Sequence, residues 1–180
     1  MRMEREAALR IFRRIGRSET KGELIVLIGA EVRGYSLTDL QRVRGVIENE
    51  CRSLPRAYKS LLLPKSIEQV FDAHHCLMSL YRKKETADRH PTDEKLSEFC
   101  TMAGEAVSNA EDPEVTMLYY LLAAFTTYVM ELPGHPVGTP FPGGKEVTQR
   151  AGIFYCPIRD KEDDVETAIC PYCVARQDEE

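Results

Sequence analysis

Residues 115–130 form the longest stretch of this chain without a charged side chain. These sixteen residues fall short of the roughly 20 apolar residues that cross a bilayer. Acidic residues flank both ends, whereas a membrane helix usually carries Lys or Arg on one side. Asp112 suits an N-cap and Pro113 the first helical position, while Pro133 and Gly134 provide a stop signal. The stretch therefore predicts a buried central helix of a water-soluble fold.

Other segments of the N-terminal part have apolar residues at helical spacing. Stripes with the i, i+3, i+4, i+7 pattern run through residues 67–81 and 96–107. Ser36 and Asp39 form a capping-box sequence ahead of a further stripe. Residues 24–28 are five apolar residues in a row, which suit a buried strand as well as a helix turn. Their helical neighbours favour a helix.

The C-terminal part has a different character. Residues 132–144 contain four prolines and four glycines, which forbid a helix and leave few backbone donors for a sheet. The stretch carries His135 and Phe141 rather than Ser and Glu, so we expect an ordered loop that packs on the helices. Residues 152–156 read as a short strand.

A chain of 180 residues suits a single domain with a real hydrophobic core. These patterns predict a mainly α, single-domain fold, a helical bundle around a central apolar helix. Residues 1–131 are expected to form the helical core. Residues 132–180 are expected to form an irregular, Pro/Gly-rich and Cys-containing segment that binds a metal and packs on that core.

Three of the six cysteines gather near the end of the chain. Cys170 and Cys173 form a C-x-x-C pair, and Cys156 precedes them by 13 intervening residues. Two thiolates at this spacing can bind one ion from a tight turn, and structural zinc takes four such ligands. His135 is the first choice for the fourth ligand, because it lies in an irregular loop with no helical stripe to explain it. We therefore expect a zinc site.

Two other interpretations of this cluster remain open. An iron-sulfur cluster is also held mostly by cysteines. The string Cys170-Pro-Tyr-Cys173 is the active-site string of glutaredoxins. Position argues against a redox role, because only seven residues follow Cys173 and no βαβ pattern surrounds it. A usual zinc knuckle has Gly where this chain has Val174.

The other cysteines lie within predicted helices. Cys51 and Cys100 fall on apolar faces and Cys76 lies beside one, so we expect them to pack as small hydrophobic residues. His74 and Cys76 follow His135 as candidates for the fourth metal ligand.

Charge is unevenly distributed along the chain. Residues 1–90 hold 18 Lys and Arg against 12 acids, net +6, and residues 91–180 hold 6 against 17, net −11. A basic stripe is predicted on the first helix at Arg10, Arg13, Arg14 and Arg17. An overall pI near 5.5 and an acidic second half disfavour nucleic acid. We expect this stripe to be a solvated face, or to dock on an acidic portion of this chain or of a second copy.

The first residues alternate charged and apolar side chains, unlike a secretory signal, so a cytoplasmic protein with reduced cysteines is expected. Three strings together are similar to an uncharacterised family of small proteins from methanogenic archaea: residues 135–144, Tyr155-Cys156-Pro157 and residues 170–177. The resemblance is clearest over residues 130–178. It implies an anaerobic archaeal cytoplasm and no assigned activity.

The expected function is metal binding. Under the first hypothesis the metal is structural and supports a surface for a protein partner or for a second copy of the chain. Under the alternative, the protein is a metal-dependent enzyme that keeps an open coordination position beside the His135 loop. No paired carboxylates, nucleophile elbow or Ser/His/Asp set in the sequence strengthens the enzyme hypothesis.

Overall fold

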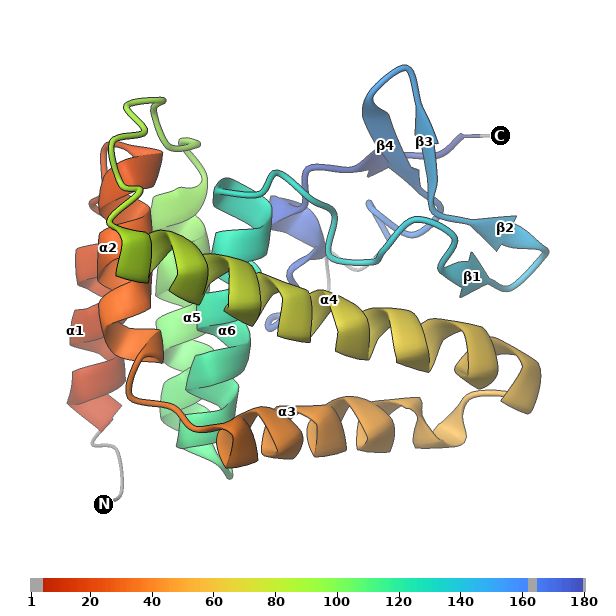
Figure 1. Cartoon of the computed structure of the whole chain (residues 1–180). Coiled ribbons are helices and arrows are strands. Elements are labelled where there is room, and N and C mark those ends of the chain that lie inside the picture. The colour runs from red at the N-terminus through yellow and green to blue at the C-terminus, as the bar shows by residue number, and fades with distance from the viewer. Residues whose placement is uncertain (1–4, 162–164, 180) are drawn as a thin grey trace.

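The computed structural model describes residues 5–161 and 165–179. Within these residues six α-helices come first, and the fold is mainly α as predicted. Figure 1 shows α1, α2, α5 and α6 side by side, with α3 and α4 crossing them and extending to one side. The helices are α1 (Arg5–Ile15), α2 (Lys21–Val32), α3 (Leu37–Glu50), α4 (Arg56–Lys83), α5 (Leu96–Asn109) and α6 (Pro113–Tyr128).

Helix α6 arises from the apolar stretch and begins where predicted. The Asp112 side chain accepts a hydrogen bond from the Val115 backbone amide at 3.3 Å, and Pro113 occupies the first turn. Most α6 residues are buried, and the helix contacts α2, α3, α4 and α5. A helix that is apolar on all sides needs neighbours on all sides, and α6 has them.

The first helices also confirm several local predictions. Ser36 and Asp39 form the capping box at the start of α3, with both reciprocal hydrogen bonds present. Residues 24–28 are helical and belong to α2. A Cβ at Gly29 would lie 2.5 Å from the Tyr81 ring, so this glycine lets α2 approach α4 closely. Arg17 lies beyond the end of α1, so the predicted basic stripe is one arginine shorter within the helix.

Helix α4 is the longest element, with 28 residues and a length of about 42 Å. It carries Pro64 near its N-terminal end. After α3, a short 3-10 helix (η1, Cys51–Ser53) turns the chain back into α4. Helices α3 and α4 thus form a hairpin that reaches past the other helices, and the C-terminal segment lies against the α4 side of it (Figure 1).

The described part of the C-terminal segment contains five short strands and one turn of 3-10 helix. These are β1 (Pro140–Phe141), β2 (Lys145–Glu146), β3 (Thr148–Arg150), β4 (Ile153–Cys156), η2 (Cys170–Tyr172) and β5 (Arg176–Gln177). Strands β1 and β2 are antiparallel, and a second sheet has the order β3-β4-β5, with β5 parallel to β4. The strand predicted at residues 152–156 is confirmed as β4.

The Pro/Gly-rich loop is more regular than expected, because β1 falls inside it. Proline can accept hydrogen bonds although it cannot donate them, which permits it in a two-residue edge strand. Flanking backbone bonds connect Gly138 N to Val147 O at 2.7 Å and Val147 N to Thr139 O at 3.0 Å. The loop also contacts α4, where Gln69 Nε2 donates to Pro133 O and Lys65 Nζ donates to Val137 O, both at 2.9 Å.

Buried apolar residues form two clusters. The large one unites all six helices and includes fully buried Phe12, Phe99 and Phe125. The small one lies in the C-terminal segment and has three buried members, Val147, Cys156 and Ala175. Tyr172 connects the two regions, because it packs edge-to-face on Phe99 with ring centroids 5.5 Å apart.

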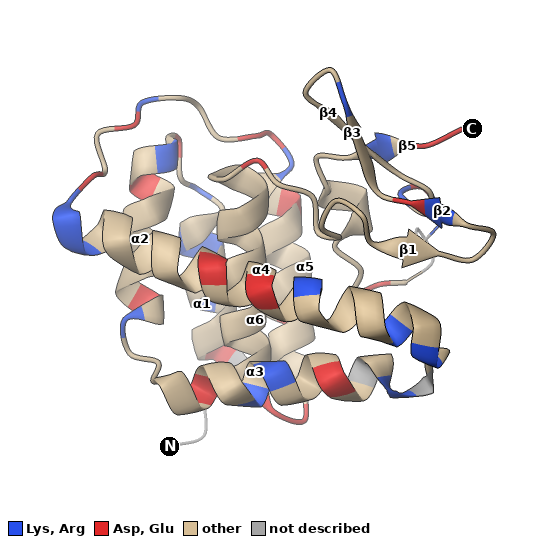
Figure 2. Ribbon diagram, turned by 45° about the vertical axis from the view of Figure 1, so that its right-hand side comes forward, with Lys and Arg blue, Asp and Glu red and all other residues tan. Residues whose placement is uncertain are grey.

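Acidic and basic residues are interspersed along α3 and α4 (Figure 2). Ion pairs join the basic first half to the acidic second half through Arg42, which reaches Asp112 and Glu114, and through Lys21, which reaches Glu131. Arg14 of the first helix pairs instead with Glu31 of α2. Among the described helices, none has the length and apolar character to cross a membrane.

Candidate functional site

Cys156 lies at the end of β4, and the turn that follows directs backbone amides at its sulfur. Burial raises the pKa of the Cys156 thiol, and hydrogen bonds from the Ile158 and Arg159 amides oppose that rise. The Cys173 sulfur is near enough to raise the Cys156 pKa further. Amide hydrogen bonds of this kind stabilise a thiolate, which is the form that binds metals.

Cys170 and Cys173 lie at the two ends of the η2 turn, where the Cys173 amide donates to the Cys170 carbonyl at 3.0 Å. The Cys173 sulfur accepts hydrogen bonds from the amides of Gly134 at 3.4 Å and Ala175 at 3.5 Å. The first of these amides belongs to the Pro/Gly-rich loop. The thiol of Cys173 therefore holds that loop against the C-terminal turn.

Two polar side chains hold the Cys156 turn beside the η2 turn. Arg159 donates to Pro171 O at 3.0 Å and to Cys173 O at 3.4 Å. Gln177 donates to Pro157 O and accepts from the Asp160 amide, both at 2.9 Å. The parallel pairing of β5 with β4 places Gln177 opposite Cys156. Nothing in the sequence pattern had singled out Arg159 or Gln177, because their roles depend on contacts across the turns.

The predicted ligands are only partly assembled. Within residues 5–161 and 165–179, no three His, Cys, Asp or Glu side chains form a group arranged to hold a metal ion. Cys173 packs against the small apolar cluster that contains Cys156, and its thiol raises the pKa of Cys156. His135 instead packs edge-to-face on Phe141 with ring centroids 5.3 Å apart. Burial lowers the His135 pKa, which favours the neutral imidazole that metals require.

The remaining cysteines and His74 lie on the helices. Cys51 and Cys100 are buried in the large cluster, as predicted, and burial raises the pKa of Cys100 to about 12. Cys76 is half-buried on α4 and packs against the same cluster. His74 is also half-buried on α4, and burial lowers its pKa.

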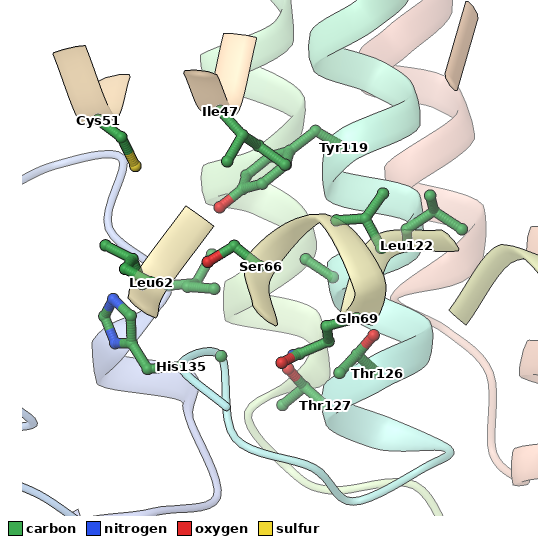
Figure 3. Close-up of a pocket in the computed structure, with 14 residues that line it drawn as sticks. Ile47, Cys51, Leu62, Ser66, Gln69, Tyr119, Leu122, Thr126, Thr127 and His135 are labelled. Carbon is green, nitrogen blue, oxygen red and sulfur yellow. The ribbon is translucent and has the colours of Figure 1, made fainter. Parts of the chain in front are cut away.

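A cavity of about 200 Å³ lies where α3, α4 and α6 meet the Pro/Gly-rich loop. Figure 3 shows His135 beside Leu62 on one side, with Gln69, Thr126 and Thr127 gathered on another. Gly134 also lines this cavity, so the loop residue that bonds to Cys173 is shared between the cysteine turns and the cavity. The sequence offered one signal for this site, the hydroxyls of Thr126 and Thr127 within the apolar stretch of α6.

Comparison with known proteins agrees with the family resemblance. Residues 20–178 match the family described as "Uncharacterized protein conserved in archaea (DUF2115)". The chain belongs to this family. The match runs from α2 to β5, so DUF2115 includes both the helices and the cysteine turns.

Named relatives of DUF2115 come from methanogens. A UPF0305 protein of Methanothermobacter thermautotrophicus is 32% identical over 139 residues, which are 77% of this chain and 84% of the relative. One of Methanopyrus kandleri is 31% identical over 133 residues, 70% of this chain and 88% of the relative. One of Methanocaldococcus jannaschii is 23% identical and covers 88% of this chain and 96% of the relative. No solved structure matches the chain.

Proposed function

We propose that this protein binds one metal ion, zinc, through Cys156, Cys170, Cys173 and His135. The ion is structural. It fastens the Pro/Gly-rich loop and the C-terminal turns to the helices, and so supports a surface for a protein partner or a second copy of the chain.

The observation that carries the proposal is the amide hydrogen bonding at two cysteines of the C-terminal segment. The amides of Gly134 and Ala175 donate to the Cys173 sulfur at 3.4 and 3.5 Å, and the Ile158 and Arg159 amides oppose the rise of the Cys156 pKa. Amides that converge on a pair of cysteines in this way accompany metal-bound thiolates. Metal binding would require the side chains of Cys170 and His135 to turn toward this pair.

The small apolar cluster supports a structural ion. Segments below about 70 residues rarely have a core large enough to stabilise them without a metal, disulfides or a partner. Residues 132–180 have only three buried cluster members within their described part, Val147, Cys156 and Ala175. Thiolate coordination would add the missing stability.

Exposed valines on the same segment support the interaction surface. Val137, Val165 and Val174 are exposed by 44%, 44% and 37%, so a partner would find three apolar side chains on this segment. A metal that orders the segment would hold these side chains in fixed positions for a partner.

Two measurements on the untagged protein, purified without oxygen, test the proposal: elemental analysis and the visible absorption spectrum. We expect about one zinc per chain and no colour. A brown protein with charge-transfer bands would show that the bound group is an iron-sulfur cluster and not zinc. Protein without stoichiometric metal, whose three clustered thiols react freely in the folded state, would show that the proposal is wrong.

X-ray absorption spectroscopy of the zinc protein would then distinguish a structural zinc site from a catalytic one. Three sulfurs and one imidazole nitrogen support the structural role. Three protein ligands with an exchangeable water would favour the metal-dependent enzyme instead. Cys156→Ser and Cys173→Ser should each remove the metal, while the matched variant Cys100→Ser should keep it, because Cys100 lies in the helical core.

A further inference from the structure

The cavity between α3, α4 and α6 has a size that suits a small organic molecule. Its volume is about 200 Å³. An apolar protein cavity of about 150 Å³ accommodates benzene. This cavity can therefore hold a single six-membered ring with one small substituent.

One side of the cavity is apolar. Ile47, Leu62 and Val70 come from α3 and α4, Leu122 and Ala123 from α6, and Ile169 from the C-terminal segment. None of the described lining residues is Asp, Glu, Lys or Arg. A buried charge without a partner is strongly unfavourable, so these walls select against ions and favour an uncharged ligand.

The other side of the cavity is polar and partly fixed. The Gln69 amide nitrogen donates to Pro133 O at 2.9 Å, which holds the Gln69 side chain in place. Thr126 and Thr127 are each 5% exposed and lie near Gln69 (Figure 3). Buried hydroxyls and amides gain from a partner that offers complementary donors and acceptors.

We propose that this cavity is a binding site for a small uncharged molecule with a planar apolar body and one neutral hydrogen-bonding group, such as an amide. The apolar body packs between Leu62, Val70 and Leu122. The polar group meets the Gln69 amide and the hydroxyls of Thr126 and Thr127. A pocket with apolar walls and a few convergent polar groups at the junction of several elements is the usual form of a small-molecule site.

Three probes of nearly equal shape test the proposal on the full chain. Benzamide carries the neutral amide, benzoate replaces it by a charge, and toluene has no polar group. Titration followed by ¹⁵N–¹H NMR should shift the amide signals of Thr126, Thr127 and Gly134 with benzamide. We expect benzamide to bind at least about tenfold more tightly than benzoate, since no described cation lines the cavity. The affinity for benzamide should exceed the affinity for toluene by about threefold or more.

Two variants locate the binding. Thr127→Val removes a hydroxyl with little change of shape, so benzamide affinity should fall about fivefold while toluene affinity stays or rises. Ala123→Leu fills the cavity and should abolish binding of both probes. Ala106→Leu is the control, because Ala106 is also a half-buried helical alanine against the large cluster but does not line the cavity.

The outcomes are decisive without reference to the metal. Absence of benzamide binding to the folded wild type overturns the proposal. Equal affinities for the three probes would also overturn it. So would unchanged benzamide affinity in the Ala123→Leu variant, provided that its circular dichroism shows an intact fold. If Ala123→Leu does not fold, the Thr127→Val variant still tests the proposal, which requires lower affinity for benzamide with unchanged or higher affinity for toluene.

Discussion

The helical region and the C-terminal segment are stabilised in different ways. In the helices, side chains from all six elements form one continuous apolar cluster, and Phe12, Phe99 and Phe125 are fully buried. In the described part of the C-terminal segment, the small cluster has three buried members, and turns that depend on polar contacts surround it, such as those of Arg159 and Gln177. We therefore expect the first region to fold by its own burial, and the second to depend on contacts to its neighbours or on an ion.

The largest expected effect comes from removing one aromatic ring from each region. Phe99 is fully buried and packs edge-to-face on Tyr120, Tyr128 and Tyr172, so Phe99→Ala should lower the free energy of unfolding by about 3–5 kcal/mol. Phe154 is half-buried beside the small cluster, so Phe154→Ala should cost less than about 2 kcal/mol. Urea denaturation followed by circular dichroism measures both.

Equal losses of unfolding free energy in the two phenylalanine variants would contradict the difference in stabilisation between the helical region and the C-terminal segment. They would mean that the small cluster unfolds together with the helices as one cooperative unit.

Metal removal is expected to affect the C-terminal segment alone. Chelation should open the Pro/Gly-rich loop and the cysteine turns together, because the Gly134 amide bonds to the Cys173 sulfur. Limited proteolysis of the chelated protein should then cut near Gly138 and near Arg159 and leave a helical fragment of about the first 130 residues. Protein with metal should resist both cuts.

Two results of the proteolysis would change this picture. Loss of all helical signal on chelation would couple the metal to the helical core. Equal cleavage of the loop with and without metal would mean that His135 is no ligand.

The smallest expected effect concerns a cysteine of the helical core. Cys100→Ala should leave the metal content unchanged and cost roughly 1 kcal/mol through lost packing. Because burial raises the Cys100 pKa to about 12, its thiol should also resist iodoacetamide in the native protein at pH 8. Mass spectrometry after brief alkylation measures this, with urea-unfolded protein as the reactive control. Loss of metal in Cys100→Ala would instead make Cys100 a ligand.

Local sequence signals predicted much of the helical region. The start of α6 at Asp112 and Pro113, the capping box at Ser36 and the helix at residues 24–28 all depend on interactions within a few residues. Such interactions act before any tertiary contact forms, so they can be read from the chain alone. The strand inside the Pro/Gly-rich loop escaped prediction, since its pairing depends on a partner strand more than on its own residues.

The candidate sites also combine features that the local sequence predicts with features that depend on the tertiary structure. The spacing of Cys170 and Cys173 predicted that both lie at one tight turn, and η2 confirms this. Only the tertiary structure decided that Cys156 and Cys173 share the small apolar cluster, and that Arg159 and Gln177 hold the two turns together. It also decided that Gln69 and Thr127 face one cavity with His135. These contacts join residues that are far apart in the chain, and their geometry follows from the packing of whole helices and turns.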